Sequence, residues 1–396
     1  MSDTVVRIAA KGDGVTAAGK HVPFGVPGDV VRADGALAWG PHHATPPCRH
    51  FPECGGCQLQ HVDEAALAAF VRERVVYAAE GQGIAIGELL PTHLSPPRSR
   101  RRATLHGLRT GRGAVLGFRA AGSHRIVNMR ECHVLDPALF ALVSPLRSLV
   151  AAWGGKRPVD ASLTLTDQGV DCSLTGVEST GLGPAEALLE FARNHALARL
   201  SIDQGYGAET LWEPGPVTVM LAGVPVGMPP AAFLQATPDG EAVLSSDAKS
   251  FLQGTGIVAD LFSGLGTFAF ALADRARVLA VEGARDAHIA CQQAAKRSGR
   301  PVHALHRDLF RNPLQPEELN RFDAVLLDPA RAGAREQVAA IAASTLSRVA
   351  YVSCNPSSWA RDSKLLVDAG FRLEALRPVG QFRWSTHVEL TSLFAR

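Results

Sequence analysis

The chain has 396 residues, a length typical of two or three domains rather than one. It is 46% hydrophobic and 20% charged, as expected of a globular protein, and its net charge of +2 neither demands nor excludes a nucleic-acid partner. No apolar run reaches the length of a signal-peptide core or a transmembrane helix, so we expect a cytoplasmic protein without a membrane association.

The N-terminal part alternates short β-type runs with glycine and proline turns, as in V-V-R-I-A-A and V-P-G-D-V-V-R. Such spacing is typical of small all-β modules. It predicts a small β barrel over residues 1–45, ending in the proline-rich linker P-H-H-A-T-P-P.

Cysteines gather directly after this linker. Cys48, Cys54 and Cys57 lie in C-R-H-F-P-E-C-G-G-C, and Cys132 follows in R-E-C-H-V-L. In a reducing compartment such a group indicates metal binding or catalysis rather than disulfides. Four thiolates can hold an iron–sulfur cluster or a zinc ion. Zinc sites more often use two close pairs, so a triplet with a distant fourth cysteine favours the cluster, but the spacing alone leaves both open.

Residues 46–232 are expected to form a central α+β domain. A helix is predicted over 63–80, further helical pieces over 136–152 and 184–196, and short strands elsewhere. The basic run R-S-R-R-R at 98–102 is a candidate phosphate contact, with a solvated charged stretch as the alternative.

After residue 233 the pattern changes to strand–helix alternation, which predicts a parallel sheet with crossover helices and a Rossmann-like α/β domain over 233–396. The expected strands of this sheet are 257–262, 277–282, 302–306, 323–328 and 348–353, with a terminal hairpin from 371–377 and 387–395.

A glycine-rich loop, D-L-F-S-G-L-G-T-F, follows the first of these strands. Gly264 and Gly266 permit a tight turn and close approach of a ligand to the helix N-terminus. Glu282 ends the next strand, where a carboxylate can bind ribose hydroxyls. Because the three-glycine dinucleotide spacing is absent, S-adenosylmethionine fits better than a dinucleotide. The alternative is a plain strand–helix turn.

Two further strand ends carry reactive side chains. Asp328 ends its strand in L-L-D-P-A-R, and Cys354 follows a buried strand in Y-V-S-C-N-P. A thiolate beside a methyl donor can add to C6 of uracil and make C5 nucleophilic, after which a base must remove the C5 proton. Glu389, in H-V-E-L, supplies a carboxylate for that step. The alternatives are a helix cap for Asp328, a buried structural thiol for Cys354 and an edge-strand charge for Glu389.

With these motifs together, the chain resembles the RNA uracil-5-methyltransferase family, in particular its iron–sulfur members that act on 23S rRNA. The resemblance covers nearly the whole chain. It implies a TRAM-like, RNA-binding N-terminal barrel and a [4Fe-4S] cluster on Cys48, Cys54, Cys57 and Cys132. It also implies Cys354 as nucleophile, in Y-V-S-C-N-P-S-S-W-A-R-D, and Glu389 as general base.

The resemblance places Gln235, from F-L-Q-A-T, and Phe262 at S-adenosylmethionine. The full set of expected cofactor-binding residues is Gln235, Phe262, Gly264, Gly266, Thr267, Glu282, Asp308 and Asp328. Two of these residues match the family less closely. Thr267 stands where the family frequently has an asparagine, and the assignment of Asp308 depends only on its position after the strand 302–306.

The function implied is methyl transfer to C5 of a uridine in 23S rRNA by a monomeric enzyme. Barrel and cluster together favour the ribosomal branch that carries both. The alternatives are a uridine methyltransferase acting on tRNA and an RNA-binding iron–sulfur protein without turnover.

Overall fold

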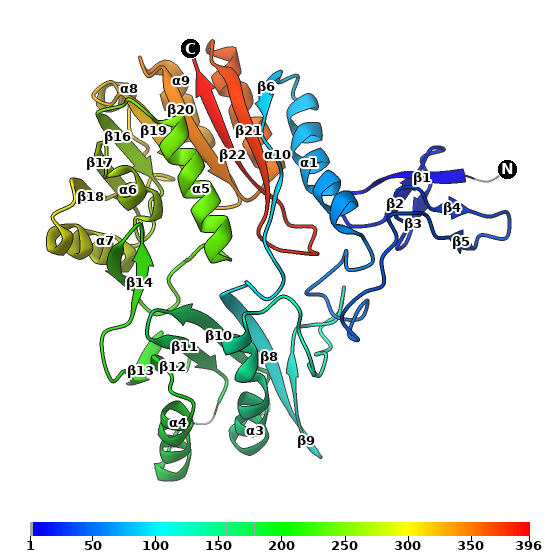
Figure 1. Cartoon of the computed structure of the whole chain (residues 1–396). Helices are drawn as coiled ribbons and strands as arrows, with labels where there is room; N and C mark the ends of the chain where they lie inside the picture. The colour runs from blue at the N-terminus through cyan, green and yellow to red at the C-terminus, as the bar shows by residue number, and fades with distance from the viewer. Residues whose placement is uncertain (1–2, 156, 178) are drawn as a thin grey trace.

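The computed structural model describes residues 3–155, 157–177 and 179–396. Figure 1 shows three lobes along the chain: a small N-terminal sheet, a mixed sheet with helices packed against it, and a large α/β sandwich that contains the C-terminus. Among the described residues, no helix is both long and apolar enough to cross a membrane.

The N-terminal lobe is an antiparallel sheet with the strand path β3-β2-β1-β4-β5 over the described residues. Its strands are short: β1 (Asp3–Ile8), β2 (Gly14–Thr16), β3 (His21–Val22), β4 (Val30–Val31) and β5 (Leu37–Ala38). Asp29 is fully buried beneath it, and its carboxylate accepts hydrogen bonds from the backbone N–H groups of Val26 (2.9 Å) and Gly40 (2.7 Å). Short antiparallel strands are therefore present where the small β barrel was predicted, while a closed barrel and its identification as TRAM-like stay predictions.

The central lobe is a mixed sheet with the order β13-β12-β11-β10-β8-β9 in the described part of the chain. Its strands are β8 (Arg102–Thr110), β9 (Gly113–Gly117), β10 (Val159–Thr166), β11 (Gly169–Thr175), β12 (Arg199–Asp203) and β13 (Ala208–Trp212). The helices that share its apolar core are α2 (Pro137–Ala141), α3 (Val143–Trp153) and α4 (Leu182–Asn194). A hairpin of β14 (Thr218–Leu221) and β15 (Val224–Gly227) leads out of this lobe.

The C-terminal lobe is built on a sheet of nine strands within the described residues, in the order β18-β17-β16-β19-β20-β22-β21-β6, with β7 also on β21. The parallel strands are β16 (Ile257–Leu261), β17 (Arg277–Glu282), β18 (Val302–His306), β19 (Ala324–Leu327) and β20 (Arg348–Ser353). All five lie where the alternation predicted them. The strand order reverses at β16, which pairs with both β17 and β19, and ligands bind at such switch points in open α/β sheets.

Helices cover both faces of this sheet. Because strand side chains alternate, Leu261 and Leu327 belong to the core on one face and Val258 and Leu326 to the core on the other. The helices on the first face are α1 (Glu64–Glu80), α8 (Pro316–Leu319), α9 (Arg335–Ala343) and α10 (Pro356–Asp368). Those on the second are α5 (Pro238–Phe251), α6 (Thr267–Leu272) and α7 (Arg285–Ser298).

One part of the predicted central range joins the C-terminal sheet. Helix α1 was expected over 63–80 and starts at Glu64, with Asp63 as N-cap, but it packs on α10 and β21. Strands β6 (Ile86–Leu89) and β7 (His93–Leu94) pair in parallel with β21. The segment 64–94 therefore packs with the last lobe, although it lies inside the range 46–232.

The expected terminal hairpin closes the sheet. It consists of β21 (Arg372–Gly380) and β22 (Glu389–Ala395), which pair antiparallel. Strand β22 lies between β21 and β20 and runs antiparallel to β20, with Ser353 opposite Leu390. This register places the residue after β20, Cys354, beside the first residue of β22, Glu389.

Candidate active site

The loop between β16 and α6 lies at the switch point of the sheet. Three of its residues have positive φ: Phe262 (64°), Gly264 (56°) and Gly266 (93°). A Cβ added at Gly264 would meet nothing within 4 Å, because this glycine lines an open cavity of about 700 Å³. The Phe262 ring lines the same cavity and contacts the Phe310 ring, with the centroids 5.1 Å apart.

Glu282 holds the loop from the end of β17. Its carboxylate accepts hydrogen bonds from the backbone N–H groups of Gly264 (2.8 Å) and Ala284 (2.6 Å). Each oxygen keeps a second lone pair, so the carboxylate, which lines the cavity, can still accept hydrogen bonds from a ligand.

The two glycines of the loop are expected to respond differently to substitution. A Cβ at Gly266 would lie 2.9 Å from both Cys291 Sγ and Phe270 Cε2. Gly266→Ala should therefore lower the free energy of unfolding by about 1–3 kcal/mol. Gly264→Ala should cost only about 1 kcal/mol, from its left-handed backbone, while its methyl group weakens ligand binding in the cavity. Denaturant unfolding and calorimetric titration with S-adenosylhomocysteine measure both effects. Equal stability losses with unchanged affinity would contradict this assignment.

Asp328 follows β19 at the same edge of the sheet. Its Oδ2 accepts a hydrogen bond from Gln235 Nε2 (3.2 Å), which links it to the loop before α5. Burial raises the pKa of Asp328 to about 7. Gln235 and Asp328 both line the same cavity as Gly264, and their role as cofactor contacts stays a prediction.

The raised pKa of Asp328 has a consequence for stability. The folded state holds the proton up to about pH 7, whereas the unfolded chain loses it near pH 4, so stability falls as the pH rises through this window. Asp328→Asn should consequently raise the melting temperature at pH 8 and change it little at pH 4. A melting-temperature difference that does not depend on pH would refute the assigned pKa direction.

Cys354 and Glu389 lie together, as the strand register requires. Glu389 is only 5% exposed, and burial together with Asp328 raises its pKa to about 8. The pKa of Cys354 is raised by burial, Glu389 and Asp328 and lowered by the Arg331 guanidinium. Arg331 is fixed to the cysteine motif, because its carbonyl accepts hydrogen bonds from Asn355 Nδ2 and the Ser358 hydroxyl, both at 3.0 Å.

Two cavities meet at this pair. The cavity of about 700 Å³ contains the glycine loop and is called the loop cavity below. The other, of about 760 Å³, is called the cleft and is lined on one side by Gly55 and Gly56. The residues that line both are Phe233, Arg331, Cys354 and Glu389. A thiol and a carboxylate can therefore reach ligands bound on either side.

The cleft is rich in positive charge. Arg100, Arg102, Arg119 and Arg331 line it, and Glu389 is the acidic side chain among its lining residues. Arg102 packs its guanidinium 4.4 Å from the centroid of the Phe233 ring, which is 60% exposed. Cationic and aromatic side chains together suit a polyanion with flat bases.

The basic run 98–102 is not a uniform charged face. Arg101 is buried, and its guanidinium donates to the Gln235 carbonyl (2.9 Å) and contacts Glu241 (2.5 Å). Arg100 and Arg102 line the cleft. Arg102, the first residue of β8, also donates from its guanidinium to the Leu234 carbonyl (2.9 Å), so Arg101 and Arg102 both hold the loop that carries Gln235.

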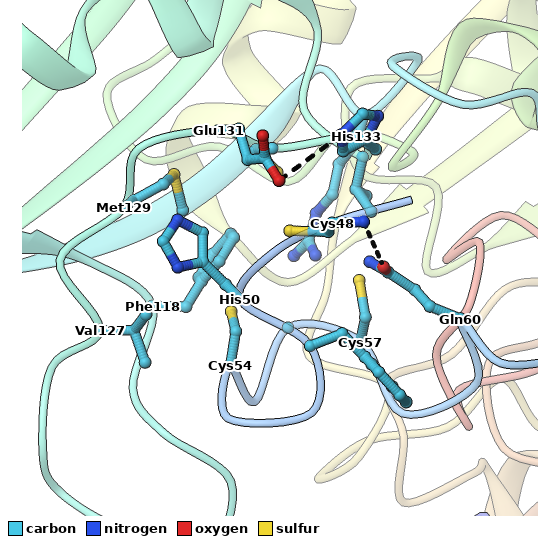
Figure 2. A pocket seen from close by; sticks show the side chains of 15 residues that line it. Cys48, His50, Cys54, Cys57, Gln60, Phe118, Val127, Met129, Glu131 and His133 are labelled. Atoms are coloured by element: carbon cyan, nitrogen blue, oxygen red, sulfur yellow. Dashed lines mark hydrogen bonds and ion pairs between the residues drawn. The ribbon is translucent and has the colours of Figure 1, made fainter. Parts of the chain in front are cut away.

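The four cysteines Cys48, Cys54, Cys57 and Cys132 line one small cavity of about 20 Å³. In Figure 2 the side chains of Cys48, Cys54 and Cys57 point toward a common space. Burial raises the pKa of all four thiols, that of Cys57 to about 12. Over the described ranges, no three His, Cys, Asp or Glu side chains are positioned to hold a metal ion. The structure thus gathers the predicted ligands without showing a formed metal site.

The cysteine cavity adjoins the cleft. Gly56, Arg100 and Phe118 line both. The Gly55 N–H donates to the Arg119 carbonyl (2.9 Å), so the cysteine segment and the loop after β9 form one wall of the cleft.

Of the other residues predicted to bind the cofactor, some line the loop cavity and some do not. Thr267 lines the loop cavity, whereas Asp308 does not and instead accepts hydrogen bonds from the backbone N–H groups of Phe310 (3.0 Å) and Arg311 (3.3 Å). Phe310 occupies the cavity wall there. Gly266 also lies outside the lining and serves the packing under the loop.

Sequence reasoning missed several residues around the reactive pair: Phe233, Phe310, Arg331 and Gln381. Phe310 lies two residues after the predicted Asp308, and Arg331 three after Asp328. Proximity to the predicted motifs was the available signal for both.

Comparison with known proteins agrees with this geometry. Residues 304–396 match the model of the tRNA (uracil-5-)-methyltransferase family. An RNA methyltransferase of Zymomonas mobilis, described as uncharacterized, is 48% identical over 99% of both chains. The 23S rRNA (uracil(1939)-C(5))-methyltransferase of Chromohalobacter salexigens is 33% identical, over 91% of this chain and 78% of the relative.

Among solved structures, the tRNA (uracil-54, C5)-methyltransferase of Pyrococcus abyssi, in complex with S-adenosyl-L-homocysteine, has the same fold. Its TM-score is 0.75 over 100% of both chains, with 21% sequence identity. This likeness concerns the fold alone.

Proposed function

The chain belongs to the RNA uracil-5-methyltransferase family, and we propose that it transfers a methyl group to C5 of a uridine in 23S rRNA. One observation carries the proposal: Cys354 and Glu389 line both the loop cavity and the cleft. A methyl donor on one side and a uracil on the other would meet at these two side chains.

The loop cavity suits S-adenosylmethionine. Phe262 and Phe310 supply aromatic surface, Glu282 offers hydrogen-bond acceptors, and Gly264 leaves room for a ligand beside its backbone. Gln235 and Asp328 lie toward Cys354, so they are placed for the end of the ligand nearer the reactive pair. When bound, S-adenosylmethionine supplies the methyl group.

The chain's own residues supply the other chemistry. The Cys354 thiolate adds to C6 of uracil, and the electron pair displaced from the C5–C6 bond makes C5 nucleophilic. After C5 is methylated, Glu389 takes the C5 proton, the double bond re-forms and the thiolate leaves. The pKa of Cys354 is raised overall, chiefly by burial; Arg331 opposes this rise and so favours the thiolate needed at the start.

The cleft would bind the RNA. Its arginines can contact phosphates, and Phe233 can stack on a base next to the target. The target uridine must leave its stack to reach Cys354. The choice of 23S rRNA rests on the relative that is 33% identical.

A tRNA substrate is the second candidate. The whole-length fold match to a tRNA enzyme shows that this architecture alone does not select the RNA. Methyl transfer from labelled S-adenosylmethionine to purified tRNA and to 23S rRNA fragments separates the two. Labelling of the rRNA fragments is expected, and labelling of tRNA alone would overturn the choice.

We further propose that Cys48, Cys54, Cys57 and Cys132 hold a [4Fe-4S] cluster. The support is their convergence on one cavity. No step of the methyl transfer needs an electron, so its role would be structural. The N–H groups of Gln58 and Leu59, next to Cys57, donate to the Trp384 carbonyl in the loop before Glu389, at 2.7 and 2.9 Å. A bound cluster would thus brace a cleft wall and that loop.

Metal analysis with an ultraviolet–visible spectrum of anaerobically purified protein tests the cluster. About four irons per chain and a charge-transfer absorption are expected. Stoichiometric zinc, or no metal, would overturn this part and leave the methyl-transfer proposal standing.

The N-terminal sheet is proposed to be a TRAM-like RNA-binding module, and the enzyme to act as a monomer. The supporting observation for the first is the packing of short antiparallel strands at the end of the chain next to the cysteine segment. Gel filtration and RNA-binding measurements on the full chain test the two statements.

A further inference from the structure

A hydrogen-bonded chain of side chains connects the reactive carboxylate to the loop cavity. Gln381 Nε2 donates to both Glu389 Oε2 and Gln235 Oε1, the second at 2.9 Å. Gln235 Nε2 in turn donates to Asp328 Oδ2 (3.2 Å). Two carboxylates are thereby joined through two amides, and Gln381 is the member bonded directly to Glu389.

The Gln381 side chain is buried inside the protein and is fixed by its protein neighbours. It is 1% exposed and lines neither the loop cavity nor the cleft. Its Oε1 accepts the N–H of Thr237 (3.3 Å), which fixes the direction of its amide donor. A Cβ at Gly240 of α5 would lie 2.4 Å from Gln381 Cγ, so the side chain is also closely packed.

We propose that Gln381 is a positioning residue that orients the Glu389 carboxylate for removal of the C5 proton. A free carboxylate can rotate. The hydrogen bond from Gln381 holds Oε2 of Glu389, so Oε1 is left pointing in one fixed direction. Asp328 accepts its hydrogen bond from Gln235 rather than from Gln381, so the Gln381 donor orients Glu389 and not Asp328. This inference rests on the proposed function of Cys354 and Glu389.

The surroundings of Glu389 agree with this role. The charged or titratable groups that face it are Asp328 after β19, Cys354 after β20 and Arg102 of β8. Asp328 raises the pKa of Glu389, and Arg102 and the Gln381 donor lower it. Removing that donor should leave Glu389 protonated to a higher pH.

Gln381→Met, which keeps the size of the side chain and removes the amide, tests the proposal. Two reactions separate the steps. RNA containing 5-fluorouracil has no C5 proton to remove, so its methylated adduct forms without the base. Turnover on uridine RNA needs the base.

We expect Gln381→Met to form the 5-fluorouracil adduct within about twofold of the wild-type rate. Turnover on uridine RNA should fall roughly 10–100-fold, within the range of general-base catalysis, and its acid limb should move to higher pH. A covalent methylated adduct should also accumulate on uridine RNA. Parallel losses in both reactions, or no loss in either, would overturn the proposal.

Gln337→Met is the matched control. Gln337 is likewise 1% exposed, but among the described residues its amide bonds the backbone of Leu314, at 2.8 and 3.1 Å, and no side chain. It should lose stability without changing the balance between adduct and turnover. If Gln381→Met does not fold, Gln381→Asn serves instead: a selective loss of turnover supports the proposal, and an equal loss of both reactions refutes it. If the wild-type protein forms no adduct at all, the proposed function fails first.

Discussion

Replacing Cys354 by alanine is expected to abolish both RNA methylation and the covalent adduct. Without the thiolate, uracil C5 stays a poor nucleophile, and the rate should fall by about 10⁴-fold or more. Incubation with S-adenosylmethionine and RNA, followed by denaturing electrophoresis and a methyl-transfer assay, measures both.

Cys172→Ala is the control for this substitution. Cys172 is a buried thiol of β11 in the central sheet, away from the cleft lining. It should retain adduct formation and turnover. Methylation by Cys354→Ala at a rate near that of the wild type would show that the reaction does not pass through this thiol.

Replacing Glu389 by glutamine should stop the reaction one step later. The amide cannot take the C5 proton, so turnover should fall about 10²–10⁴-fold while a methylated covalent adduct accumulates on ordinary uridine RNA. In the wild-type protein the rate at which the methylated adduct collapses to product should rise as the pH increases through the pKa of Glu389, about 8, because the base acts only when ionised. Glu389→Gln should lose this limb of the pH profile.

Glu374→Gln provides the comparison. Glu374 lies on β21 of the same hairpin, toward the end of the strand remote from Glu389, and it pairs with Arg372. Its variant should keep wild-type turnover and pH dependence. If Glu389→Gln turned over normally, another group would have to be the base.

The local elements of this protein could be predicted from sequence because each carries its own signal. Buried apolar runs mark the parallel strands, and Asp63 caps α1 at the expected position. The reactive pair was also within reach, since Cys354 directly follows the predicted strand 348–353 and Glu389 lies in the predicted hairpin strand 387–395.

The pairing of strands that lie far apart in the sequence could not be predicted in this way. Strand β6 is four residues long and pairs with β21, although the whole central lobe lies between them in the sequence. No local sequence pattern specifies this pairing. The distinction between buried Arg101 and cleft-lining Arg102 depends on how the chain at the start of β8 packs against the loop of Gln235. Gln381 likewise becomes informative only when the hairpin places its amide beside Glu389.

The most direct test of the central claim is mass spectrometry of the wild-type protein after reaction with S-adenosylmethionine and RNA that contains 5-fluorouracil. We expect an adduct that survives denaturation, on the peptide containing Cys354, with a mass that includes one methylated fluorouridine. Absence of an adduct, or attachment through any other cysteine, would contradict it.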